Sequence, residues 1–351
     1  MTAAERHSTV GADRGPTGTA ARSGVAPANS AASPHRIPLR GWASVLRRAG
    51  QHVLSDRLQV ASAGIAFFAV LSIAPLLVTA LSVYGAVNTP EQAMEQMSSV
   101  AARLPAELQP LVADQLTTIT AASAQVNTFR GLTGLVIALY TATTAATYLI
   151  DALTHAYREP ETRGFFHRSG LALTIVFGGA ALLGAVIWVS GLVAQAADGA
   201  PEGVRLLVSA LAWPVLATVV AAALAVLYRF APDRKQARWR WISVGAVLAT
   251  GLWLATSFGL FAYVQSLGSY ESTYGSLAGV AISMFWLWIT VVLVILGAAV
   301  NAEAERQTVR DSTVGPEQPL GRRGAVVADS APPYPAEECG DQAHDTPGRI
   351  P

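Results

Sequence analysis

The sequence predicts an all-α membrane protein: a polytopic bundle of six transmembrane helices, with amphipathic helices in an outer loop and disordered termini. Six stretches contain no Asp, Glu, Lys or Arg, over residues 60–87, 131–150, 169–197, 206–228, 241–266 and 276–300. A helix needs about 20 apolar residues to cross roughly 30 Å of hydrocarbon, and each stretch reaches that length. Membrane β-strands need only about 10 residues of alternating character, so these long unbroken stretches argue against a barrel.

The predicted membrane domain covers residues 39–306, between two polar tails at 1–38 and 307–351. The tails are rich in Ala, Ser, Gly, Pro and charge, and such composition buries too little apolar surface to order itself, which predicts disorder. Between the first two spans, residues 88–130 form a long loop in which apolar residues recur at steps of three and four on either side of Pro105. This spacing predicts two amphipathic helices, which either cap the bundle or serve as a gate or a contact with an envelope partner.

A shorter helix is predicted just before the first span. Its apolar residues recur at helical spacing and are flanked by arginines; they are Trp42, Val45, Leu46, Ala49 and Val53. This pattern is compatible with two positions. The helix lies either at the lipid headgroups, with its guanidinium groups on anionic lipid, or as a soluble helix packed under the bundle.

The distribution of arginine predicts the orientation in the membrane. Basic residues are retained on the cytoplasmic side, and they gather before span one, between spans two and three, and between spans four and five. The other connections are poor in them. The chain is therefore expected to be a multi-pass protein of the cell membrane with both termini in the cytoplasm.

Polar residues inside the spans are the candidates for a translocation path, because polar groups in hydrocarbon usually face a bundle interior or a wet cavity. Two stripes share a helix face and could line a cavity between spans one and two: Ser72, Pro75 and Thr79 in the first, and Tyr140, Thr144, Thr147, Asp151 and His155 in the second. The alternatives are hydroxyls bonded back to their own helix, and an ion pair of Asp151 and His155 at the cytoplasmic end.

Arginines near the predicted cytoplasmic surface are candidates for binding anionic headgroups, each contributing about 1 kcal/mol near such a surface. They are Arg47, Arg48, Arg57, Arg229, Arg234 and Arg238.

Enzyme signatures are missing from the sequence. It has no H-E-x-x-H, no G-x-S-x-G and no Cys/His cluster, and its only lysine, Lys235, is not in a phosphate-binding loop. We expect no cofactor, no metal and no enzymatic activity. The net charge of +1 and the absence of a soluble basic domain predict no nucleic-acid partner. Nothing in the sequence indicates the oligomeric state.

Four motifs resemble the YihY/BrkB family of bacterial inner-membrane proteins. They are A-F-F-A-V-L-S-I-A-P ending at Pro75, Y-R-F-A-P-D at 228–233, Y-G-S-L at 274–277 and G-A-A-V-N-A-E at 297–303. The resemblance implies six spans, a role in envelope integrity and serum resistance as a virulence factor, and movement of lipid-like molecules. It also carries an older ribonuclease label, which the lack of an acid cluster or a basic groove argues against.

The function predicted from the sequence is export or flipping of an amphiphilic, lipid-like molecule, with membrane lipids as partners. The alternative is a scaffold that moves nothing and binds envelope proteins through the helices of residues 88–130.

Overall fold

The computed structural model describes residues 33–87, 124–197, 199–266, 276–308 and 310–330. Within these ranges the regular structure is helical, apart from one isolated bridge between Ala237 and Thr313. Six helices are long and apolar enough to cross a membrane: α2 (Asp56–Val87), α5 (Ala124–Ala156), α6 (Phe165–Ala197), α7 (Glu202–Phe230), α8 (Trp239–Ser266) and α10 (Ser276–Glu305). The predicted all-α, six-span fold class is confirmed.

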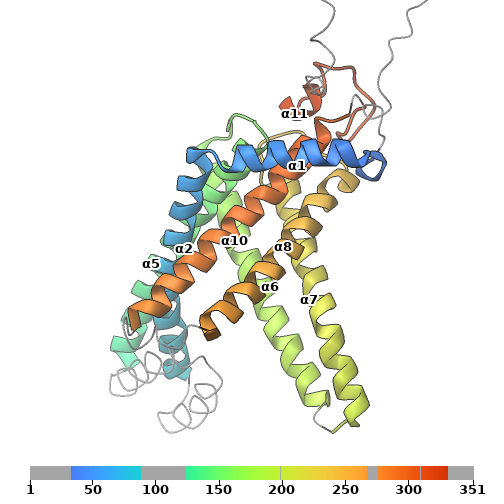
Figure 1. The fold of residues 1–351 in the computed structure, drawn as a ribbon. Coiled ribbons are helices and arrows are strands. Elements are labelled where there is room, and N and C mark those ends of the chain that lie inside the picture. The colour runs from blue at the N-terminus through green and yellow to red at the C-terminus, as the bar shows by residue number, and fades with distance from the viewer. Residues whose placement is uncertain (1–32, 88–123, 198, 267–275, 309, 331–351) are drawn as a thin grey trace, which may run out of the picture.

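The helices pack unevenly along their length. α2 makes its most extensive contact with α5, and α10 packs on α2 and α8. The pair α6 and α7 joins the bundle through α5 and α8, and diverges from α2 and α5 toward the end remote from α1 (Leu39–Val53) (Figure 1). The end at which α1 lies is called the α1 end below. The predicted amphipathic helices of the 88–130 loop fall mainly on residues 88–123, outside the described residues.

α8 and α10 cross at two glycines, Gly245 and Gly297. A Cβ added to either would collide with the backbone of the facing helix, and a Cβ on Gly297 would also lie 2.8 Å from the Cβ of Ala249. Beside this crossing the Tyr228 hydroxyl donates to the Val294 carbonyl at 2.7 Å. Small residues allow helix backbones to approach closely, so this crossing depends on the absence of side chains.

α1 lies across the ends of the long helices and packs on α10 (Figure 1). It buries Gly41, Val45, Ala49 and Val53, one residue per turn. Leu46, which the predicted stripe included, is instead 45% exposed. Of the two positions that the sequence left open, packing on the bundle explains why one face of α1 is buried. Leu39 and Leu46 are exposed and leave apolar side chains uncovered on the same helix.

The C-terminal tail departs from its prediction. The sequence predicts disorder from residue 307 onward, whereas residues 310–330, called the strap below, pack against the α1 end and include the short helix α11 (Val326–Asp329). Ser312 and Val327 are fully buried, and Arg323 is 4% exposed. The predicted disorder is therefore wrong for the strap.

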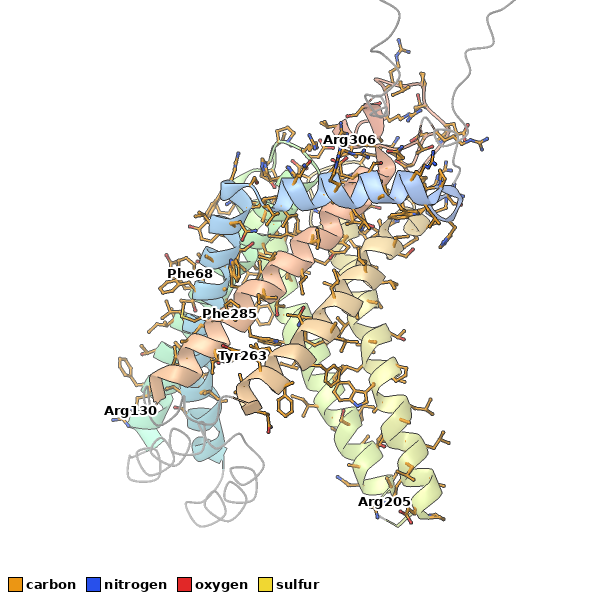
Figure 2. All side chains as sticks on the ribbon, viewed as in Figure 1. Phe68, Arg130, Arg205, Tyr263, Phe285 and Arg306 are labelled. Carbon is orange, nitrogen blue, oxygen red and sulfur yellow. The ribbon has the colours of Figure 1, made fainter. Side chains whose placement is uncertain are left out.

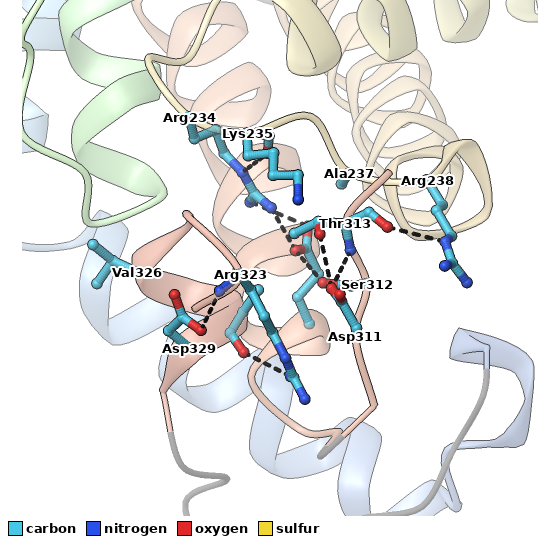
Figure 3. A network of polar contacts seen from close by, with 12 residues as sticks. Arg234, Lys235, Ala237, Arg238, Asp311, Ser312, Thr313, Arg323, Val326 and Asp329 are labelled. Atoms are coloured by element: carbon cyan, nitrogen blue, oxygen red, sulfur yellow. Dashed lines mark hydrogen bonds and ion pairs between the residues drawn. The ribbon is translucent and has the colours of Figure 1, made fainter. Parts of the chain in front are cut away.

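The strap is ordered by bonds to distant turns rather than by a large apolar core (Figure 3). The Arg238 backbone N–H donates to the Ser312 carbonyl at 2.9 Å, and the Val314 N–H donates to the Gln236 carbonyl at 3.0 Å. On the other side, the Val326 N–H donates to the Glu159 carboxylate at 2.7 Å. The strap thus ties together the α5–α6 loop and the α7–α8 loop.

Candidate functional site

A pocket of about 490 Å³ lies between α5 and α6. Eleven residues line it: Val136, Leu139, Tyr140, Thr143, Thr144, Thr147 and Tyr148 from α5, and Phe165, Arg168, Ser169 and Leu173 from α6. The two helices run antiparallel, and α6 begins close to where α5 ends. The charged and polar residues of α6 therefore lie toward the α1 end, and the aliphatic residues lie deeper along the spans.

Two of the three threonines that line the pocket present acceptors rather than donors. Thr144 donates its hydroxyl proton to the Tyr140 carbonyl at 2.7 Å, and Thr147 donates to the Thr143 carbonyl at 2.8 Å. Each hydroxyl oxygen keeps lone pairs for a ligand. Tyr140 is 70% exposed, so its phenol is open to the surroundings. The pocket combines an apolar wall with a column of weakly polar oxygen atoms.

An ion pair closes the polar end of the pocket. Arg168 Nη2 lies 3.1 Å from Asp151 Oδ2, and the two side chains are 33% and 36% exposed. Such half-exposed pairs contribute at most about 1 kcal/mol to stability. Asp151 Oδ1 is buried without a hydrogen-bond partner among the described residues. Asp151 does not line the pocket itself, so it acts on the pocket by positioning the Arg168 guanidinium.

The predicted stripe of span one lies elsewhere. Ser72 donates to the Ala69 carbonyl and Thr79 to the Pro75 carbonyl, at 2.7 and 2.9 Å, and neither they nor Pro75 line the pocket. A Cβ on Gly134 of α5 would lie 3.0 Å from the Pro75 carbonyl oxygen. This face of α2 therefore packs closely on α5, and the structure groups only Tyr140, Thr144 and Thr147 of the predicted path in one pocket.

His155 faces α1 rather than Asp151. Its ring centroid lies 5.6 Å from that of His52, whose Nε2 is 3.4 Å from the His155 carbonyl oxygen. Burial lowers the pKa of His52 below its ordinary value, and the neighbouring Arg158 acts in the same direction. The alternative of an ion pair between Asp151 and His155 is replaced by the pair with Arg168.

Two of the predicted headgroup arginines are committed to internal carboxylates. Arg234 Nη2 lies 2.7 Å from Glu305 Oε2, with both side chains almost fully buried, and Arg48 Nε lies 2.8 Å from Glu303 Oε2. Burial alone would lower the pKa of Arg234, but the Glu305 carboxylate raises it overall.

The other four predicted arginines differ in exposure. Arg229 donates to the Ala237 carbonyl and lies over the Trp239 ring at 4.5 Å. Arg238 donates to the Thr313 carbonyl of the strap at 3.0 Å. Arg47 and Arg57 are exposed at the α1 end.

The sequence reasoning missed the α6 side of the pocket, above all Arg168. A signal was present: Asp151 closes span two and Arg168 opens span three, so opposite charges meet where antiparallel neighbours join. Within the described ranges no three His, Cys, Asp or Glu side chains are grouped to hold a metal ion.

The family model described as Virulence factor BrkB matches residues 49–321. The chain belongs to the BrkB family. It is accordingly a membrane protein, and the resemblance drawn from its four motifs is confirmed. No solved structure matches this BrkB-family chain.

Among curated proteins, the chain is similar to the putative ribonuclease-like protein YfkH of Bacillus subtilis, with 31% identity over 48% of this chain and 63% of YfkH. It is also similar to UPF0761 membrane proteins of Verminephrobacter eiseniae, 28% identical over 76% of this chain and 63% of the relative, and of Delftia acidovorans, 27% identical over 76% and 62%. The chain thus spans less than two thirds of the length of these relatives.

Proposed function

We propose that this BrkB-family protein exports or flips an amphiphilic, lipid-like molecule and thereby supports the envelope, using the α5–α6 pocket to hold the molecule. The observation that carries the proposal is the polarity of the pocket. Its aliphatic wall, which includes Val136 and Leu173, suits an acyl chain, and the Arg168 guanidinium at the α1 end suits an anionic headgroup.

The hydroxyl column explains how a polar group could travel between these ends. A headgroup leaving water loses hydrogen bonds, and each bond regained from a threonine or tyrosine oxygen offsets about 0.5–1.5 kcal/mol of that loss. Thr144 and Thr147 stand one turn apart along the pocket, so a headgroup that leaves one can reach the next.

The orientation forms part of the proposal. We place the α1 end in the cytoplasm, because the arginine-rich turns gather there and basic residues are retained on that side. Anionic lipid of the cytoplasmic leaflet would then meet Arg47 and Arg57 first. Transport would run downhill or on a gradient or partner.

The test is lipid scrambling by the full-length chain in liposomes that contain fluorescent phospholipid, followed by quenching of the outer leaflet. Thr144→Val removes a pocket hydroxyl, and we expect about a three- to tenfold slower rate from the lost hydrogen bond. Thr174→Val is the matched control, because Thr174 is exposed on α6, bonds back to the Gly170 carbonyl at 2.9 Å and does not line the pocket.

Asp151→Asn and Asp151→Ala test the ion pair in the same assay. Both substitutions release Arg168 from the position that Asp151 fixes. In these variants we expect anionic lipid to be scrambled more slowly than zwitterionic lipid. If the Thr144 and Asp151 variants keep the wild-type scrambling rate, with abundance and fold retained, the proposed site is wrong. A wild-type protein that scrambles nothing would instead favour the scaffold that binds envelope proteins through residues 88–130.

A further inference from the structure

Three arginines from three parts of the fold converge on one carboxylate at the α1 end. Arg48 of α1 donates from Nε to Glu303 Oε2 at 2.8 Å, and Arg158, which follows α5, donates from Nη2 to Oε1 at 2.9 Å. Arg306, just after α10, donates from Nη1 to both carboxylate oxygens at 2.9 and 3.1 Å. Arg48, Arg158 and Arg306 are called the arginine cluster below.

The charges of this cluster do not balance. Three guanidinium groups against the single carboxylate of Glu303 leave two positive charges, since 3 − 1 = 2. The remaining contact, from Arg48 Nη2 to Gln307 Oε1 at 2.9 Å, is to a neutral amide. The Nε of Arg306 is buried and has no hydrogen-bond acceptor among the described residues.

His52 lies beside the cluster. The charged groups that act most on it include Arg158 and Arg306, which are positive, and Glu303, which is negative. His155, whose ring lies beside that of His52 at a tilt, is also close to the positive charge of Arg57. Like charges this close repel, and a buried or half-buried cluster of them is stabilised when an anion binds.

The backbone at Arg158 is held in a conformation that favours glycine. Its φ is +60°, and its N–H donates to the His155 carbonyl while the next N–H, of Glu159, donates to the Thr154 carbonyl. This is a helix end at which the left-handed position is usually occupied by Gly. The arginine at this position brings its guanidinium to Glu303, and its side chain remains 40% exposed.

The cluster lies where two of the apolar spans end. The second and sixth spans end at Ala156 and Glu305, so Arg158 and Arg306 follow the apolar segments directly. Figure 2 shows Arg306 beside α1, at the end of the bundle. A phosphate group of a lipid at the membrane surface would therefore meet the exposed edges of these side chains without leaving its layer.

We infer that the arginine cluster is a binding site for a phosphate monoester, with Arg158 as its accessible contact and Glu303 as the group that orients the three guanidinium forks. A phosphate monoester carries close to two negative charges at neutral pH, which matches the excess of the cluster. Guanidinium forks bind phosphate oxygens in pairs. This site is separate from the α5–α6 pocket and does not depend on whether the protein moves lipid.

The test measures binding to the purified full-length chain in neutral detergent by titration calorimetry. One arm uses short-chain phosphatidic acid, a second uses inorganic phosphate, and a third uses short-chain phosphatidylcholine. Saturable binding of phosphatidic acid alone identifies a lipid headgroup as the ligand, and equal binding of inorganic phosphate identifies a free phosphate; either supports the site. No saturable binding of the first two, or equal binding of phosphatidylcholine, overturns it.

Variants locate the binding. Arg158→Gly removes one guanidinium and suits the backbone, so we expect a folded protein with about tenfold weaker binding. Arg48→Gln is a second variant with the same expectation. Arg40→Gln is the control, since Arg40 is exposed on α1 and outside the cluster. If Arg40→Gln weakens binding as much as the cluster variants do, the effect comes from general surface charge and the proposed site is wrong. This outcome is independent of the result of the scrambling assay.

Discussion

The buried pair of Arg234 and Glu305 should hold the strap on the bundle. Arg234 donates from Nη1 and Nη2 to the two Glu305 oxygens at 3.3 and 2.7 Å, and Ser312 of the strap donates its hydroxyl to Glu305 at 2.9 Å. The two charged side chains are 3% and 0% exposed, and the Tyr157 ring lies 4.8 Å from the guanidinium carbon. Removing one partner leaves an uncompensated buried charge.

The magnitude follows from that burial. Glu305→Leu alone and Arg234→Met alone should each lower the free energy of unfolding by about 3–5 kcal/mol, which is the cost of breaking a buried pair. The double variant removes both charges and loses mainly the Ser312 bond, about 1 kcal/mol, so it should be more stable than either single variant. The double-mutant cycle should then give a coupling energy of at least about 5 kcal/mol.

Two measurements check this. Unfolding in mixed micelles of rising dodecyl sulfate content, followed by far-UV circular dichroism, gives the free energies. Limited proteolysis reports on the strap, which should be cut faster in both single variants. Strictly additive losses, or single variants within about 1 kcal/mol of wild type, would refute the reasoning, because they would mean that solvent screens the pair.

Three other predictions follow from the same structure. Gly297→Ala inserts a Cβ into the α8–α10 crossing and should cost about 1–3 kcal/mol by denaturant titration, whereas Gly251→Ala, with open space around it, should be neutral or slightly stabilising. Burial raises the pKa of Glu159 above its ordinary value of 4.5. The contribution of this carboxyl group to stability is therefore present below pH 4.5 and is lost as the pH rises through the pKa of the folded state. In Glu159→Gln, the unfolding midpoint measured across this pH range should lose that dependence. In a cysteine-free background, an impermeant maleimide on intact cells should label Gly199→Cys and not Lys235→Cys, and the reverse pattern would invert the proposed orientation.

The spans could be predicted from sequence because the bilayer imposes a simple rule. A stretch such as 276–300, free of charge and long enough, has no stable place but hydrocarbon. The ends of the helices were less well predicted. α2 begins at Asp56 and α5 at Ala124, since a helix continues into the interface after the apolar stretch has ended.

The order of the strap could not be predicted, because the amino-acid composition of this segment does not indicate it. Residues 310–330 have no apolar periodicity, and low hydrophobicity usually means disorder. Here, bonds to distant groups replace a core: the Ser312 carbonyl accepts from the Arg238 N–H, and the Val326 N–H donates to the Glu159 carboxylate. Such pairings are visible only once the turns they join are placed.

The candidate path was half predictable for a related reason. Helical spacing places Tyr140, Thr144 and Thr147 on one face of α5, and in the structure these three residues line the same pocket. Spacing does not say which helix covers the face. The expected partner was the first span, but α5 approaches that span through Gly131 and Gly134, and the hydroxyl face lies against α6.

The contacts of the α5–α6 loop suggest where the pocket can widen. This loop joins the two helices that line the pocket, and it is held to its surroundings: Arg163 donates to the Ala231 carbonyl at 2.8 Å, the Thr162 N–H donates to Asp233 at 2.7 Å, and Glu159 accepts from the strap. Separating α6 from α5 at the α1 end would break several of these bonds, at about 1 kcal/mol or more each. At the remote end α6 and α7 already diverge from α2 and α5 (Figure 1). We therefore expect any opening of the pocket to be a rotation of α6 about its α1 end, with the loop and the strap as the fixed side of the hinge.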